Sequence, residues 1–169
     1  MKTLEEQMAF YAAYHQDARN KATHFVGVPV IILSLFIPLA WPRLEIAGLP
    51  LTAAMLFALV VLAYYFILDF FLGLAMAALT LGLVWAGHQI AALGAGPAWA
   101  WFAALFVGGW ILQLVGHGFE GRRPALADNL FQIFVAPIFL CAEIFFALGY
   151  KPGLHRAVQE RARVLRSGT

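Results

Sequence analysis

The sequence predicts an all-α integral membrane helical bundle, with four to five apolar segments that follow an N-terminal amphipathic helix. Of its 169 residues, 63% are hydrophobic and 12% are charged, whereas soluble domains are about half apolar and a quarter charged. Charge is also unevenly placed, because Asp69 is the single charged side chain between Glu45 and Glu120. The sequence has no internal repeat or low-complexity linker, so residues 1–169 are expected to form one membrane-embedded domain.

The N-terminal amphipathic helix is predicted from Thr3 to about Arg19. Its apolar positions recur at three- and four-residue spacing, as on one face of a helix. These positions are Leu4, Met8, Tyr11, Ala12 and His15. The helix is expected to break at 17–20, where Asn20 can cap the next one. His15 and His24 would face opposite sides of one straight helix, but a turn between them lets them converge.

The apolar segments differ in how well they fit a membrane span, which needs about 20 apolar residues. Four segments are long enough, and one is marginal because it is short and contains Pro29 and Pro38. The marginal segment is 25–41, and the others are 51–71, 74–93, 99–117 and 130–150. Asp69 and Gly73 mark the junction between the second and third segments, and residues 94–97 form a tight loop.

The basic residues leave the membrane topology open. They lie in the N-terminal region, at Arg43, at Arg122–Arg123 and in the tail after Lys151. Basic groups favour the cytoplasmic side, yet these groups cannot all be cytoplasmic if every segment crosses. The alternative is that the last segment, which contains Pro137, enters the membrane and returns. The net charge of +2 is too small to indicate nucleic-acid binding.

A metal-capable cluster ends the long apolar region. Gln113, His117 and Glu120 are spaced to form one stripe of a helix, provided that the helix continues past its glycines. His15 and His24 lie at segment ends that can share a membrane face with His117. Ionisable groups inside a membrane usually have a function or a partner, and imidazole suits zinc, iron, copper or nickel. A packing role is the alternative for any one of these histidines.

The residues after the cluster suggest a substrate contact. Arg122 and Arg123 can bind a carboxylate in a bidentate manner, or they can serve as a membrane anchor on the cytoplasmic side. Gln113 is a further candidate for substrate binding, because it shares the stripe with His117.

Other polar residues have simpler expected roles. His88 lies near the far end of its segment and is expected to pack there. Asp128–Asn129 fits a helix cap. Glu143 lies within an apolar segment and should face protein, with an arginine or a histidine of the cluster as its expected partner.

Several motifs of enzymes and cofactor proteins are absent. There is no phosphate-binding loop, dinucleotide fingerprint, Cys-x-x-Cys, serine nucleophile elbow or His-Glu-x-x-His in the sequence. The clustered histidine boxes of membrane di-iron enzymes are also missing, which favours a mononuclear site over a dinuclear one.

Two blocks of sequence resemble the fungal-type 2-hydroxy fatty acid dioxygenase family, long described as a domain of unknown function. The first block is Phe10-Tyr-Ala-Ala-Tyr-His15, followed by Asn20, His24 and Val28-Pro29. The second runs from Gly109 to Gln132 and continues with Ala136-Pro137 and Glu143. Together they cover about a third of the chain.

The resemblance implies α-oxidation of a 2-hydroxy fatty acid in a membrane, with Fe(II) as cofactor and O2 as co-substrate. It implies His15, His24 and His117 as iron ligands, and Glu120 and Asn20 as catalytic residues. Glu120 follows His117 by one residue fewer than in the fungal pattern, so its role stays open. The expected location is a bacterial inner membrane, or the endoplasmic reticulum of a eukaryote. Oligomeric state is not predicted.

Two other functions also fit the residues. One is a membrane haem protein that uses two histidines as axial ligands for electron transfer. The other is a non-catalytic lipid-binding or scaffold protein. A haem Soret band would indicate the first, and a lack of hydroxy-acid turnover would indicate the second.

Overall fold

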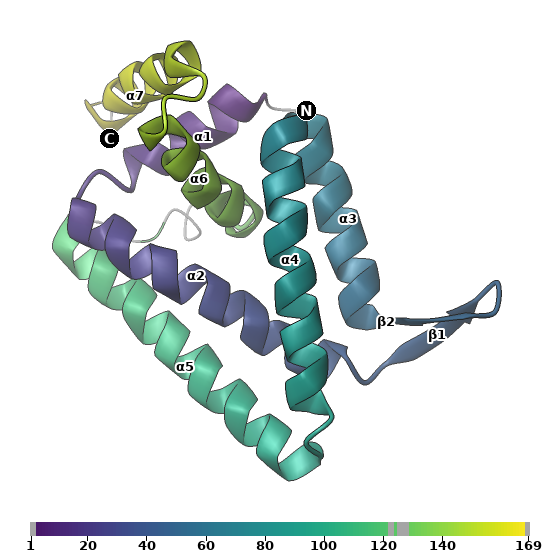
Figure 1. The fold of residues 1–169 in the computed structure, drawn as a ribbon. Coiled ribbons are helices and arrows are strands. Elements are labelled where there is room, and N and C mark those ends of the chain that lie inside the picture. Colours follow the sequence, from purple (N-terminus) through teal and green to yellow (C-terminus); the bar gives the residue numbers. More distant parts are fainter. Residues whose placement is uncertain (1–2, 122–123, 125–128, 168–169) are drawn as a thin grey trace. The chain divides into compact units, whose positions relative to one another are not determined.

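The computed structural model describes residues 3–121, 124 and 129–167, and it confirms the predicted all-α, membrane-type fold. The described residues form seven helices and one two-stranded hairpin (Figure 1). The helices are α1 (Leu4–Ala13), α2 (Ala18–Leu39), α3 (Ala53–Leu68), α4 (Phe70–Ala91), α5 (Ala95–Glu120), α6 (Gln132–Ala147) and α7 (Pro152–Ser167). The strands are β1 (Arg43–Ile46) and β2 (Leu49–Thr52), which pair antiparallel.

The chain divides into two compact units. Unit 1 combines Met1–Phe25 with Gln113–Thr169, and unit 2 is the continuous segment Val26–Leu112. The helices α2 and α5 each contribute one end to unit 1 and the remainder to unit 2. A single membrane-embedded domain over the whole chain stays a prediction.

In the described part of the chain, three helices are long and apolar enough to cross a membrane, namely α2, α4 and α5. The segment predicted as marginal belongs to this group, because α2 begins at Ala18 and includes polar residues before the apolar run. The segment predicted from Leu51 becomes a helix of 16 residues, since Leu51 and Thr52 lie in β2. The last apolar helix, α6, also has 16 residues.

The hairpin was not predicted from the sequence. Ala47 and Gly48 form its turn with φ values of 53° and 77°. Two successive residues with positive φ are typical of the tight turns that join antiparallel strands. The hairpin thus uses residues that were assigned to a loop and to the start of a span.

The predicted break before α2 is present, but its cap was assigned wrongly. The helix α1 begins after Thr3, which forms a capping box with Glu6, and ends at Ala13. Asp17 caps α2, because its side chain accepts a hydrogen bond from the Arg19 backbone N–H at 2.8 Å. Asn20 lies within the first turn of α2, which leaves its side chain available for other contacts.

The predicted junction at Asp69 is confirmed. Asp69 ends α3 and begins α4, and its side chain accepts hydrogen bonds from the backbone N–H groups of Phe71 and Leu72. Gly73 lies directly against Phe66, where a Cβ atom would come within 2.8 Å of the Phe66 ring. The absence of a side chain at Gly73 therefore lets α4 fold back along α3.

Unit 2 packs through small residues, as membrane helices commonly do. Gly87 of α4 contacts Phe36 of α2, and Gly109 of α5 contacts Ile31 of α2. Many large apolar side chains of this unit remain exposed, including Trp85 of α4, at 66%. Exposed apolar surface on candidate spans is the surface expected to contact lipid.

In unit 1, the N-terminal helix is covered by other helices. Its helix α1 packs against α6 and α7, and Met8, Ala9 and Ala12 on α1 are fully buried. The amphipathic character predicted for the N-terminus therefore serves packing against protein. The end of α1 leads directly to the site.

Candidate metal centre

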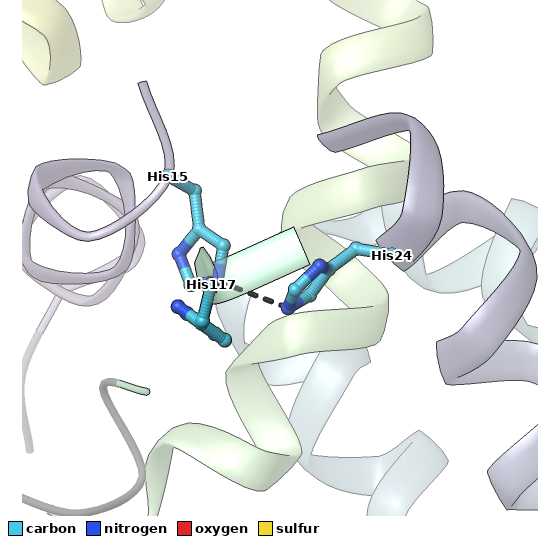
Figure 2. Close-up of side chains that lie close together, drawn as sticks. All are labelled: His15, His24 and His117. Carbon is cyan, nitrogen blue, oxygen red and sulfur yellow. Dashed lines mark hydrogen bonds between the residues drawn. The ribbon is translucent and has the colours of Figure 1, made fainter. Parts of the chain in front are cut away.

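Three histidines from different parts of the sequence meet inside unit 1 (Figure 2). His15 follows α1, His24 lies in α2 and His117 lies near the end of α5. The ring centroids are 4.7 Å apart for His15 and His24, 4.9 Å for His15 and His117, and 5.0 Å for His24 and His117. One nitrogen from each ring lies within 4.8 Å of the others, a separation that allows all three to bind one metal ion.

The hydrogen bonds of two rings direct their free nitrogens at each other. The Nδ1 atom of His15 is 2.8 Å from the Tyr11 carbonyl oxygen, and Nδ1 of His24 is 2.9 Å from the Asn20 carbonyl oxygen. Because a carbonyl only accepts, each Nδ1 carries the proton and each Nε2 of the neutral ring presents a lone pair. These two Nε2 atoms lie 3.2 Å apart, a separation that a shared proton or one bound metal ion would make favourable.

Burial favours neutral rings in this cluster. His15 and His24 are each 2% exposed and His117 is 7% exposed. Burial, and next the nearby His24, hold the pKa of His15 well below its usual value. The Tyr11 ring stacks on His15 at a centroid distance of 3.9 Å. A neutral, oriented imidazole is the form that binds metal.

Gly116 allows α5 to approach α2 at this level. A Cβ atom at position 116 would lie 2.2 Å from the Thr23 hydroxyl, 2.6 Å from Asn20 Oδ1 and 3.2 Å from His24 Nδ1. His117 is the next residue, so this close approach places its ring beside that of His24. Sequence reasoning treated Gly116 only as a risk to helix continuity.

Glu120 is buried at the centre of a hydrogen-bond network. Its Oε2 atom accepts from the backbone N–H groups of Gln16 and Asp17 at 3.0 and 2.8 Å, and from Asn20 Nδ2 at 3.2 Å. Its Oε1 atom pairs with the Arg166 guanidinium. These contacts attach the end of α5 to the linker between His15 and His24.

The predicted stripe on α5 is confirmed, because the helix continues through both glycines to Glu120. Gln113, His117 and Glu120 are all buried. The Nε2 atom of Gln113 has no hydrogen-bond partner within the described part of the chain. A substrate contact at Gln113 and catalytic roles for Glu120 and Asn20 stay predictions.

Other candidate residues have different outcomes. Arg122, Arg123 and Asp128 lie outside the described residues. Asn129 accepts from the Phe131 backbone N–H at 3.0 Å, but it does not cap α6 as predicted, because the N-cap residue is Phe131 and no described side chain caps the helix.

Among the described residues Glu143 pairs with a lysine, whereas an arginine or a histidine of the cluster was predicted. Its Oε2 atom lies 2.6 Å from the Lys21 ammonium group. The prediction was wrong because Lys21 was treated as part of a charged N-terminal region, whereas α2 places it beside α6.

His88 lies outside the histidine cluster, as expected. It belongs to unit 2, where Nε2 is 3.0 Å from the Thr52 hydroxyl and Nδ1 is 2.7 Å from the Val84 carbonyl oxygen. These contacts fit a packing role at the end of α4.

Two charged residues near the site were missed by sequence reasoning, Lys21 and Arg166. Lys21 follows Asn20 directly, so its position one turn before His24 was a usable signal. Arg166 lies in the basic tail and carries no local signal that relates it to Glu120. Its role depends on contacts between distant parts of the chain.

The sequence model of one protein family matches residues 1–148, and that family is described as 2-hydroxy-palmitic acid dioxygenase Mpo1-like. The chain belongs to the Mpo1-like family. A curated relative from Saccharomyces cerevisiae, the 2-hydroxy-palmitic acid dioxygenase MPO1, is 33% identical over an alignment of 159 residues that covers 92% of this chain and 87% of the yeast protein. No solved structure matches the chain.

The Mpo1-like match includes all three histidines and Glu120, but it ends before α7. The family resemblance seen in the sequence is therefore confirmed. The site contacts that involve α7 come from a segment beyond the matched region.

Proposed function

We propose that this chain is an Fe(II)-dependent membrane dioxygenase that converts a 2-hydroxy long-chain fatty acid to the fatty acid one carbon shorter. The observation that carries the proposal is the buried group of His15, His24 and His117 in a member of the Mpo1-like family. The name of the yeast relative, a 2-hydroxy-palmitic acid dioxygenase, supports the substrate class.

The donor set fits a single iron ion. Three neutral imidazoles suit Fe(II) among other transition metals, and three protein ligands leave coordination positions for substrate and O2. Two of these imidazoles are fixed by hydrogen bonds from Nδ1 to backbone carbonyls, the arrangement that usually orients histidine ligands. Bound iron would supply the redox centre at which the hydroxy acid and O2 react.

The proposed reaction balances without a further reductant. R-CH(OH)-COOH and O2 give R-COOH, CO2 and H2O, so the C1–C2 bond breaks while C2 becomes the new carboxyl carbon. No nucleotide or 2-oxoglutarate is needed. This agrees with a sequence that contains no nucleotide-binding motif.

The protein's own groups orient the ligands and exclude water. Glu120 and Asn20 hold the linker between His15 and His24 through the contacts described above, which favours a positioning role for both. Arg122 or Arg123 would bind the substrate carboxylate, and Gln113 would face the substrate from α5. The acyl chain would lie among apolar helices in a multi-pass membrane protein.

Anaerobic purification followed by iron analysis and oxygen-consumption assays tests the proposal. We expect about one iron per chain, oxygen uptake with 2-hydroxypalmitic acid, and release of a product one carbon shorter. His117→Ala should lose both iron and activity, whereas His88→Ala, in the other unit, should keep both. Turnover by iron-free protein, or full activity of His117→Ala, would refute the proposal.

A visible spectrum of the same sample separates the alternatives. A haem Soret band would indicate the electron-transfer function, and iron without hydroxy-acid turnover would indicate a non-catalytic protein.

A further inference from the structure

The C-terminal helix α7 packs along α1 in unit 1 (Figure 1). Its Val158 and Ala162 are buried. Arg161 lies 3.4 Å from Glu5 and 3.3 Å from Glu6, the two acidic residues in the first turn of α1. These contacts fix α7 against the same helix that leads to His15.

The last turn of α7 reaches the metal centre. Arg166 pairs with Glu120, and it also donates to the Ala13 carbonyl oxygen at 3.3 Å. The Glu120 side chain is fully buried, whereas that of Arg166 is 34% exposed. A buried carboxylate needs a cation and several hydrogen-bond donors to offset the loss of hydration. Arg166 supplies the cation.

Glu120 connects Arg166 to two of the histidines through its hydrogen bonds. The backbone N–H groups bound by Glu120 belong to Gln16 and Asp17, the residues directly after His15. Glu120 also binds Asn20, whose carbonyl oxygen accepts the Nδ1 proton of His24. A shift of Glu120 would therefore change the separation and the orientation of the His15 and His24 rings.

We propose that Arg166 is a positioning residue of the metal centre, which holds Glu120 in place and thereby sets the geometry of His15 and His24. The inference rests on the proposed function, because it assumes that these histidines bind a metal ion. It assigns a role in the site to a helix that lies beyond the region matched by the family model.

Titration of the metal-free, full-length protein with Co(II) in detergent micelles tests this role, with the visible absorption bands of bound Co(II) as readout. Loss of outer contacts to metal ligands typically weakens binding by about 10- to 100-fold, so Arg166→Gln should weaken Co(II) binding by about tenfold or more. Arg166→Lys keeps the positive charge and should recover part of the affinity. Arg163→Gln, at an exposed position on the same helix, should bind Co(II) like the wild type.

A double variant identifies Glu120 as the link. In a Glu120→Gln background no buried charge needs a partner, so Arg166→Gln should cause little further loss of Co(II) affinity. The double variant also tests the link if Arg166→Gln alone does not fold, because the double variant removes both charges. Size-exclusion profiles and thermal unfolding confirm that each protein is folded.

The possible failures can be told apart. Folded Arg166→Gln that binds Co(II) like the wild type would refute the role of Arg166 and leave the proposed function intact. A further tenfold loss in the Glu120→Gln background would refute the link through Glu120. A wild-type protein that binds neither Co(II) nor Fe(II) would refute the metal centre itself.

Discussion

Gly116 determines how closely α5 and α2 pack beside the proposed metal centre. It lies where α5 packs tightly against α2 within unit 1, and a Cβ atom there would overlap Thr23 and Asn20. Both neighbours lie on the helix that carries His24. A side chain at position 116 must therefore move α5, α2 or both, and His117 moves with α5.

We expect Gly116→Ala to destabilise the protein by about 1–3 kcal/mol, the usual cost of overpacking, and to weaken metal binding. Gly118→Ala is the matched control, because a Cβ atom at that position meets nothing within 4 Å. It should be neutral or stabilising, since alanine favours a helix over glycine. Thermal unfolding and Co(II) titration of both variants provide the measurements. Equal behaviour of the two variants would contradict this account.

His15 gives the metal-free protein a pH dependence. Its pKa in the folded chain is lowered, chiefly by burial, and the unfolded value is about 6.5. The unfolded chain therefore binds more protons between these two values, so stability is complete above about pH 6.5 and falls as the pH drops towards the folded value. Unfolding midpoints of chelator-treated protein from pH 8 to 5 should decrease with acid. His15→Gln should show a shallower decrease, and an unchanged slope would contradict the prediction.

At the residue scale, the sequence predicted which polar residues lie together better than the contacts that hold them in place. The three histidines and Glu120 were found because polar residues are conspicuous in an apolar chain. Gly116 was missed because close helix approach depends on the partner surface. Asn20 was assigned to a cap, although Asp17 has that role three residues earlier, because both residue types cap helices equally well.

The ion pair between Lys21 and Glu143 joins α2 to α6 within unit 1. Both side chains are mostly buried, at 21% and 14% exposed, and the charged atoms are 2.6 Å apart. The Lys21 ammonium also lies 6.0 Å from the centre of the Phe139 ring. The pair therefore fixes α6 next to the first turns of α2.

Lys21→Met should destabilise the protein by about 2 kcal/mol, because it leaves the Glu143 carboxylate buried without its cation. The double variant Lys21→Met/Glu143→Leu should recover much of that loss. Arg19→Gln is the comparison, since Arg19 is 66% exposed in its pair with Asp17 and such pairs contribute little. Denaturant unfolding in micelles measures all three. A larger loss for Arg19→Gln than for Lys21→Met would contradict this interpretation.

At the element scale, hydropathy located the apolar segments but not their ends. The short hairpin and the start of α2 at Ala18 changed the lengths of two predicted spans. Hydropathy averages over a window, whereas a helix begins where a side chain such as Asp17 or Thr52 satisfies its first N–H groups. The packing of α7 against α1 was also missed, because it depends on contacts between residues more than 150 positions apart, such as Arg161 and Glu5.

At the scale of the whole molecule, metal binding should stabilise the folded chain. The proposed ligands come from both sequence segments of unit 1, so the unfolded chain cannot present them together. A ligand at 100 times its dissociation constant contributes about 2.7 kcal/mol. We therefore expect Co(II) to raise the unfolding midpoint of metal-free protein and a chelator to reverse the effect. His117→Ala should show no such rise, and an equal rise in that variant would contradict the three-histidine site.

Because unit 1 consists of two separate segments of the sequence, its two parts are synthesised at different times. All of Val26–Leu112 lies between His24 and His117. At a synthesis rate of roughly 5–20 residues per second, the first two histidines exist for several seconds before the third is made. During that interval the growing chain offers an incomplete binding site with two ligands. The proposed metal site would therefore be complete, and able to select its metal, only at the last stage of synthesis, after α5, α6 and α7 have been made.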